Sequence, residues 1–209
     1  MKKTVIKIDE EKYPYLLKQI DNPPKQIYVY GNPINLNQKM VTVVGTCNPS
    51  FQGKREAIKI VKELIKREYC IVTSITKGID EIVFKEVLEN NGKVIVSIPW
   101  GIRDIRNRKY LNKFKYILEN NGNIITEFDF YEGIVSKKYT DLNRVLCGLS
   151  KSLIIIEAGM TSGTIITAQY SLEQNRDIYA VLGNLKSPKK VGTNFLIKQG
   201  AKPIISAVL

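Results

Sequence analysis

Short apolar runs alternate with stretches of helical periodicity along most of this chain. Residues 54–67 and 79–90 carry apolar side chains at the three- and four-residue spacing of one helical face. Compact apolar runs lie at 41–44, 70–73, 93–98, 123–126, 153–156 and 177–181. Strands that alternate with helices favour a parallel sheet with right-handed crossovers. We therefore expect a single-domain α/β fold, a Rossmann-like, mostly parallel sheet with helices on both faces.

Residues 1–40 have a different pattern. Asp21-Asn22-Pro23-Pro24 is typical of a turn, and residues 26–30 alternate as a strand does. We interpret residues 1–40 as a lead-in segment that packs on a main domain over 41–209. A chain of 209 residues, of which 44% are hydrophobic, is long enough for one well-buried domain and too short for two large ones.

The charge is strongly positive. Lys and Arg number 32 against 20 Asp and Glu, which gives a formal net charge of +12. Such an excess favours a polyanionic partner such as nucleic acid, although a solvated basic surface would give the same count. No stretch approaches the roughly 18 apolar residues of a membrane span, and the apolar run after Lys3 is too short for a signal peptide. We expect a cytoplasmic protein with no membrane partner.

The residue types exclude several kinds of chemistry. The chain has no histidine, which removes Ser-His-Asp and Cys-His nucleophile pairs and the commonest metal ligand. Cys47, Cys70 and Cys147 are widely spaced, so they offer neither a disulfide framework nor a zinc motif. No loop has the three-glycine dinucleotide fingerprint or the Gly-Lys-Ser/Thr of a P-loop. We expect no metal, no cofactor and no catalytic residue.

Small and hydroxyl residues follow two of the predicted buried strands. Residues 45–50 come after the run at 41–44, and residues 157–168 come after the run at 153–156. Free N–H groups at a helix start can hold an anion there, and ligands of open α/β sheets bind outside the carboxyl ends of the strands. The loops at 45–50, 74–80, 100–108 and 161–167 therefore predict one phosphate-binding crevice. The alternative is local: the glycines only form tight turns, and Ser50, Ser162 and Thr164 only cap helices.

An ordered set of motifs resembles a known family. The set comprises Val43-Val44-Gly45-Thr46, Thr73-Ser74 with Lys77-Gly78-Ile79-Asp80, Asn143-Arg144 with Gly148-Leu149-Ser150, Glu157-Ala158, Ser162 to Ala168, and Gly192-Thr193-Asn194. In this order the motifs resemble the central Rossmann-like domain of the DNA-processing protein family DprA, also called Smf, almost from end to end. No single motif is specific; the ordered set is.

The resemblance implies a DNA-processing protein that binds single-stranded DNA along a basic groove and hands it to the RecA recombinase in natural transformation (competence) or recombination. It also implies a homodimer. The residues that we expect to contact nucleic acid or phosphate are Gly45, Thr46, Ser50, Ser74, Lys77, Gly78, Arg103, Arg106, Arg108, Asn143, Arg144, Ser162, Gly163, Thr164 and Thr167.

The chain also departs from the family pattern. The usual Gly-Ser-Arg of the first loop is Gly45-Thr46-Cys47, the usual Arg-Asn-Arg is Leu142-Asn143-Arg144, and the usual Tyr-Pro of the fourth loop is Ile105-Arg106. We expect a divergent member. Because the chain begins at the lead-in and stops soon after Gly200-Ala201, we also expect it to lack the N-terminal helical and C-terminal winged-helix-like domains of many relatives.

A different function is open on the same fold. Rossmann-like proteins of this kind include nucleotide or nucleotide-sugar binding sensors and phosphoribohydrolases. Glu157 is a candidate acid for glycosidic cleavage, and Ser162-Gly163-Thr164 partly resembles the loop that such enzymes use, although the Pro-Gly-Gly before it is missing. Ligand size separates the two functions: a polymer covers the basic loops, and a mononucleotide contacts only residues 45–50 and 162–164.

Overall fold

One twisted sheet runs through the molecule. The computed structural model describes residues 2–32, 34–102, 110–129 and 138–205, and within these ranges nine strands form a sheet of order β1-β2-β6-β5-β4-β3-β7-β8-β9. The strands are β1 (Lys3–Lys7), β2 (Gln26–Tyr30), β3 (Met40–Val44), β4 (Cys70–Ser74), β5 (Lys93–Ser97), β6 (Asn123–Thr126), β7 (Ser152–Ile155), β8 (Asp177–Val181) and β9 (Lys202–Ile204). The described helices are α1 (Tyr15–Lys18), α2 (Phe51–Lys66), α3 (Ile79–Glu89), α4 (Leu111–Glu119), α5 (Lys138–Gly148), α6 (Gly163–Glu173) and α7 (Val191–Lys198).

The strand order reverses beside β3. From β3 the chain steps outward through β4 and β5 to β6, and then returns to place β7 on the other side of β3. Thr42 of β3 is aligned with Val72 on one side and with Leu153 on the other, and both pairings are parallel. Neighbouring strands from β6 to β9 are all parallel, whereas β1 and β2 pair antiparallel and β2 pairs antiparallel with β6. This arrangement confirms the predicted α/β fold.

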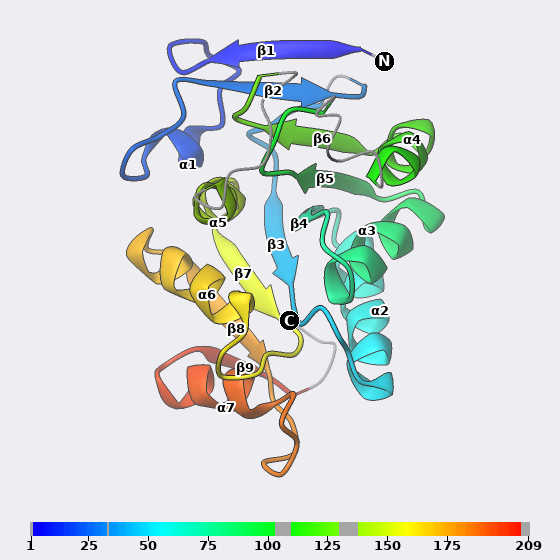
Figure 1. Ribbon diagram of the computed structural model, residues 1–209, viewed down its shortest axis with the longest axis vertical. Helices are drawn as coiled ribbons and strands as arrows, with labels where there is room; N and C mark the ends of the chain where they lie inside the picture. The colour runs from blue at the N-terminus through cyan, green and yellow to red at the C-terminus, as the bar shows by residue number, and fades with distance from the viewer. Residues whose placement is uncertain (1, 33, 103–109, 130–137, 206–209) are drawn as a thin grey trace.

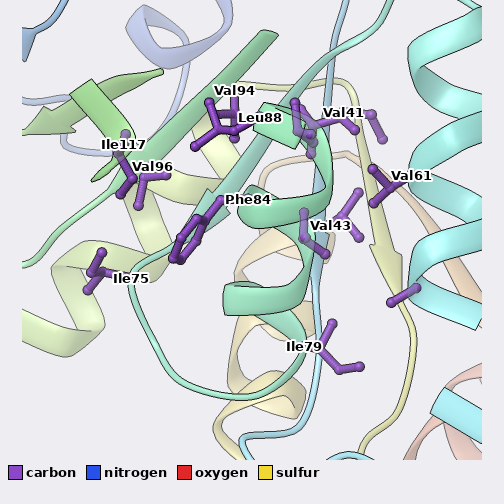
Figure 2. Packing of buried hydrophobic residues seen from close by; sticks show 14 of the residues in the cluster. Val41, Val43, Val61, Ile75, Ile79, Phe84, Leu88, Val94, Val96 and Ile117 are labelled. Carbon is purple, nitrogen blue, oxygen red and sulfur yellow. The ribbon is translucent and has the colours of Figure 1, made fainter. Parts of the chain in front are cut away.

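Helices cover both faces of the sheet (Figure 1). Helices α2, α3 and α4 lie on one side, and α1, α5 and α6 lie on the other. Each layer encloses its own hydrophobic core: Phe84 of α3 belongs to the first cluster, and Leu146 of α5 belongs to the second. Figure 2 shows Ile79 and Phe84 of α3 among sheet side chains such as Val96. The apolar runs are continuous because strands covered on both faces have no solvent side.

Two strands of the structure were not predicted. Only Ile6 of β1 and Ile204 of β9 are buried, so neither segment has the apolar run of a central strand. β1 pairs along its whole length with β2, and β2 joins the sheet at β6, so the first residues share the sheet of the rest of the chain. The division at residue 40 stays a prediction. No helix in the described part of the chain is long and apolar enough to cross a membrane.

Candidate functional site

A cavity of about 310 Å³ lies at the carboxyl ends of β3 and β4, beside the start of α6. It occupies the point where the strand order reverses, which is where open α/β sheets bind their ligands. The residues predicted from the sequence that line the cavity are Gly45, Thr46, Ser74, Asn143, Ser162, Gly163, Thr164 and Thr167. The tertiary structure thus brings together segments that lie more than a hundred positions apart in the chain.

The loop after β3 is held to its neighbours by its backbone. The N–H group of Thr46 donates to the carbonyl of Glu157, which follows β7, at 2.8 Å. The carbonyl of Thr46 accepts from the N–H group of Ile79 at the start of α3, at 3.1 Å. The N–H group of Gly45 donates to Asp80 at 3.1 Å. These bonds fix the loop between the two strands on either side of β3, so the cavity has a rigid wall.

Asp80 organises the other side of this wall from inside α3. Its buried carboxylate accepts hydrogen bonds from the hydroxyls of Ser74 and Thr76 and from the N–H group of Gly45. Burial raises the pKa of the Asp80 carboxyl to about 6, and the hydrogen bonds to the charged form offset only part of that rise. Asp80 stands in the motif Lys77-Gly78-Ile79-Asp80, but it was not among the predicted contact residues, because an acidic residue in the first turn of a helix is ordinary.

Asp80→Asn is expected to change how stability depends on pH. Because the folded pKa lies above the unfolded value of 3.8, the folded protein holds a proton between about pH 4 and pH 6 that the unfolded chain has lost. The contribution of Asp80 to stability is therefore present below pH 4 and lost as the pH rises through 6, by at most about 3 kcal/mol. Urea unfolding from pH 4.5 to 7.5 should show that the free energy of unfolding falls less with rising pH in the variant than in the wild type. Parallel curves would contradict the raised pKa.

The start of α6 forms the third wall. Ser162 precedes the helix, and its hydroxyl oxygen is buried without a hydrogen-bond partner among the described residues; it does not cap the helix. The hydroxyl of Thr167 donates to the side-chain oxygen of Asn143 at 3.0 Å, which ties α6 to α5. The first N–H groups of a helix have no partner within it and favour an anion. A phosphate oxygen in the cavity would satisfy both these groups and the hydroxyl of Ser162.

Two predicted site residues have their polar groups engaged elsewhere. Ser50 caps α2: its hydroxyl accepts from the N–H group of Gly53 at 2.9 Å and donates to Glu157 at 2.6 Å. The N–H group of Ser50 donates to the second oxygen of Glu157, so the buried carboxylate anchors the start of α2. The guanidinium of Arg144 pairs with Glu127 at 2.6 Å and donates to the carbonyl of Asn22. Neither Ser50 nor Arg144 lines the cavity.

Of the predicted basic residues on the loops, the structure describes Lys77 and not the arginines. Lys77 is exposed on the loop between β4 and α3, near Cys47 of the first loop. Gly78 follows it with a φ of 90°, where the chain turns into α3. Arg103, Arg106 and Arg108 lie outside the described residues. A cation that the sequence did not indicate is Lys189, whose ammonium donates to the carbonyl of Asn48 in the first loop; its position before α7 carries no motif that would have revealed this contact.

Comparisons with known proteins match nearly the whole chain to one family. The model of the family "DNA recombination-mediator protein A" matches residues 4–208. The chain is 31% identical over 203 residues to the DNA processing protein DprA of Bacillus subtilis, which covers 97% of the chain and 68% of that protein. It is also 31% identical over 197 residues to the protein Smf of Escherichia coli, and it spans 53% of the length of that protein.

Solved structures that resemble this fold include two of DprA proteins. The X-ray structure of DprA from Streptococcus pneumoniae superposes with a TM-score of 0.89 at 29% identity, over 99% of this chain and 72% of that one. The structure of DprA from Helicobacter pylori superposes with a TM-score of 0.85 at 25% identity, over 99% of this chain and 93% of that one, and concerns the single-stranded DNA binding mode of that protein.

Proposed function

The chain belongs to the DNA recombination-mediator protein A family, the DprA/Smf family that its motifs resemble, and from this premise we propose that it processes DNA by binding a single strand at the cavity beside β3. The observation that carries the proposal is the meeting of the predicted hydroxyl and glycine residues in one cavity at the strand reversal. A net charge of +12 favours the same kind of ligand.

The groups around the cavity suit a phosphate backbone. Helix N–H groups and hydroxyls fix the position of phosphates without reading sequence, and lysines neutralise their charge. In this chain the start of α6 and Ser162 supply the first kind of group, and Lys77 and Lys189 supply the second. The family arginine of the first loop is replaced by Cys47, and both lysines lie close to that loop, Lys77 near Cys47 and Lys189 at Asn48.

We further propose that the protein acts by binding and not by catalysis. Glu157 is the candidate acid of the hydrolase alternative. Both of its carboxylate oxygens accept hydrogen bonds from Ser50, and it is not among the residues that line the cavity. Family membership also motivates the finer proposals that the bound strand serves transformation or recombination, that it is handed to RecA, and that the protein forms a homodimer.

Binding of a fluorescent oligo-dT should weaken steeply with salt. Each phosphate neutralised on a single strand contributes a slope of about −0.7 to log K against log salt. Lys77→Ala should flatten the slope by about one such contact, because the substitution removes the ammonium that would neutralise a phosphate. Lys198→Ala, an exposed lysine at the far end of α7, is the matched control and should leave the slope unchanged. A slope near zero for the wild-type protein would refute the proposal.

A mononucleotide sensor is the second candidate, because the cavity volume of about 310 Å³ is within the range of small-molecule sites. The same titration separates the two functions when mononucleotides are added as competitors. Single-stranded DNA bound across several loops should resist them. Displacement of oligo-dT, or thermal stabilisation by a mononucleotide without DNA binding, would favour the sensor.

A further inference from the structure

We propose that single-stranded DNA leaving the cavity continues along the solvent face of α2, with a base stacked on Phe51 and phosphates held by Arg55 and Lys59. This inference rests on the proposed function and extends its binding site. We call this surface the α2 outer face; it comprises Phe51, Arg55, Lys59, Lys62 and Lys66.

Helix geometry places these residues in one line. They follow spacings of three and four positions, so their side chains lie on one side of the helix. All five are exposed, whereas the opposite side of α2 buries Ala57, Ile60, Val61 and Leu64 against the sheet. A helix of 16 residues is about 24 Å long, so the line is long enough to follow several nucleotides.

The acidic residues of α2 do not cancel this charge. Glu56 turns toward α7 and pairs with the buried ammonium of Lys190. Glu63 pairs with Arg67 at 2.8 Å, at the end of the helix. Within the described ranges, neither Arg55 nor Lys59 has a carboxylate partner. Two cations of the α2 outer face are therefore available for an external anion, and they stand next to each other along the line.

Phe51 gives the surface a second property. Its side chain is 76% exposed at the first residue of α2, where it contributes nothing to either core. The guanidinium carbon of Arg55 lies 5.9 Å from the centre of its ring. An exposed aromatic ring with a cation beside it is the combination that binds single strands without sequence preference, because every base has a face to stack.

The α2 outer face begins where the cavity ends. Cys47 lines the cavity, and the chain reaches Phe51 four residues later, as it leaves β3 and enters α2 (Figure 1). The bonds between Ser50 and Glu157 fix this start of the helix against the strand that borders the cavity. Lys189 contacts the same short segment at Asn48. Residues 48–50, which connect the cavity to Phe51, are uncharged, so a single DNA strand can pass over this loop onto Phe51.

The test compares oligonucleotides of two lengths. An oligo-dT of about 6 nucleotides fills the cavity region alone, and one of about 20 also reaches α2. Phe51→Ala should weaken binding of the longer strand about tenfold, the loss of one stacked base, and leave the shorter one unchanged. Phe51→Trp should restore binding. Arg55→Gln with Lys59→Gln should lower the salt slope of the longer strand by about two contacts.

Leu172→Ala is the matched control for the loss of an exposed apolar side chain. Leu172 is 70% exposed near the end of α6 that points away from the cavity, and its replacement should change neither affinity. Urea unfolding should show that Phe51→Ala leaves stability unaltered. A wild-type protein that binds neither strand would refute the proposed function and this inference with it. Wild-type binding with no effect of Phe51→Ala, or with equal loss at both lengths, would overturn the α2 outer face alone.

Discussion

Replacing Gly78 by alanine is expected to destabilise the protein by about 3 kcal/mol and to abolish binding of single-stranded DNA. Gly78 has a φ of 90°, in the left-handed region that side chains rarely adopt. A Cβ atom would also lie 2.6 Å from two backbone atoms of Cys47 in the first loop. Because backbone cannot give way as a flexible side chain can, the first loop would be displaced and the cavity wall with it.

Gly163→Ala is the matched control for this substitution. Gly163 lines the cavity itself, whereas Gly78 stands behind the first loop, and no heavy atom lies within 4 Å of the position that the Cβ of residue 163 would take. Alanine is favoured over glycine in a helix, so Gly163→Ala should keep or slightly raise stability. Urea unfolding and oligo-dT titration of both variants make the comparison. A Gly78→Ala protein with wild-type stability and affinity would show that the first loop does not need this close approach.

Arg144→Ala is expected to cost about 3 kcal/mol of folding stability through the loss of a partly buried ion pair. The side chains of Arg144 and Glu127 are only 12% and 14% exposed, so removal of the arginine leaves a poorly solvated carboxylate behind. The lost bond to the carbonyl of Asn22 also releases α5 from the segment that precedes β2. The structure shows the guanidinium of Arg144 paired with Glu127, and the phosphate contact expected from the sequence stays a prediction.

The measurement has to separate stability from DNA binding. Arg67→Ala is the control for stability, because Arg67 and Glu63 form a more exposed pair along one helix, for which a loss of about 1 kcal/mol or less is expected. At a temperature where Arg144→Ala remains folded, its salt slope for oligo-dT should equal that of the wild type. A flatter slope with unchanged stability would instead assign Arg144 to the phosphate contacts.

Much of the site could be predicted because strand-end loops have a local signature. The small and hydroxyl residues after β3, β4 and β7 were identified from the apolar runs that they follow, and Gly45, Ser74 and Thr164 line the cavity. Ser50 has no such local signature. Its residue type suits a phosphate contact and a helix cap equally, and only the position of Glu157 reveals which of the two the structure forms.

The sequence alone determined the alternation of strands and helices, the positions of the candidate loops and, through an ordered set of motifs, the family. Each of these follows from periodicity or residue type within a short window. Only the tertiary structure decided that β7 lies beside β3, that Asp80 is buried against the first loop, and that Arg144 faces Glu127. These are choices of partner between distant segments, and they depend on how whole helices and strands pack together, which no local pattern encodes.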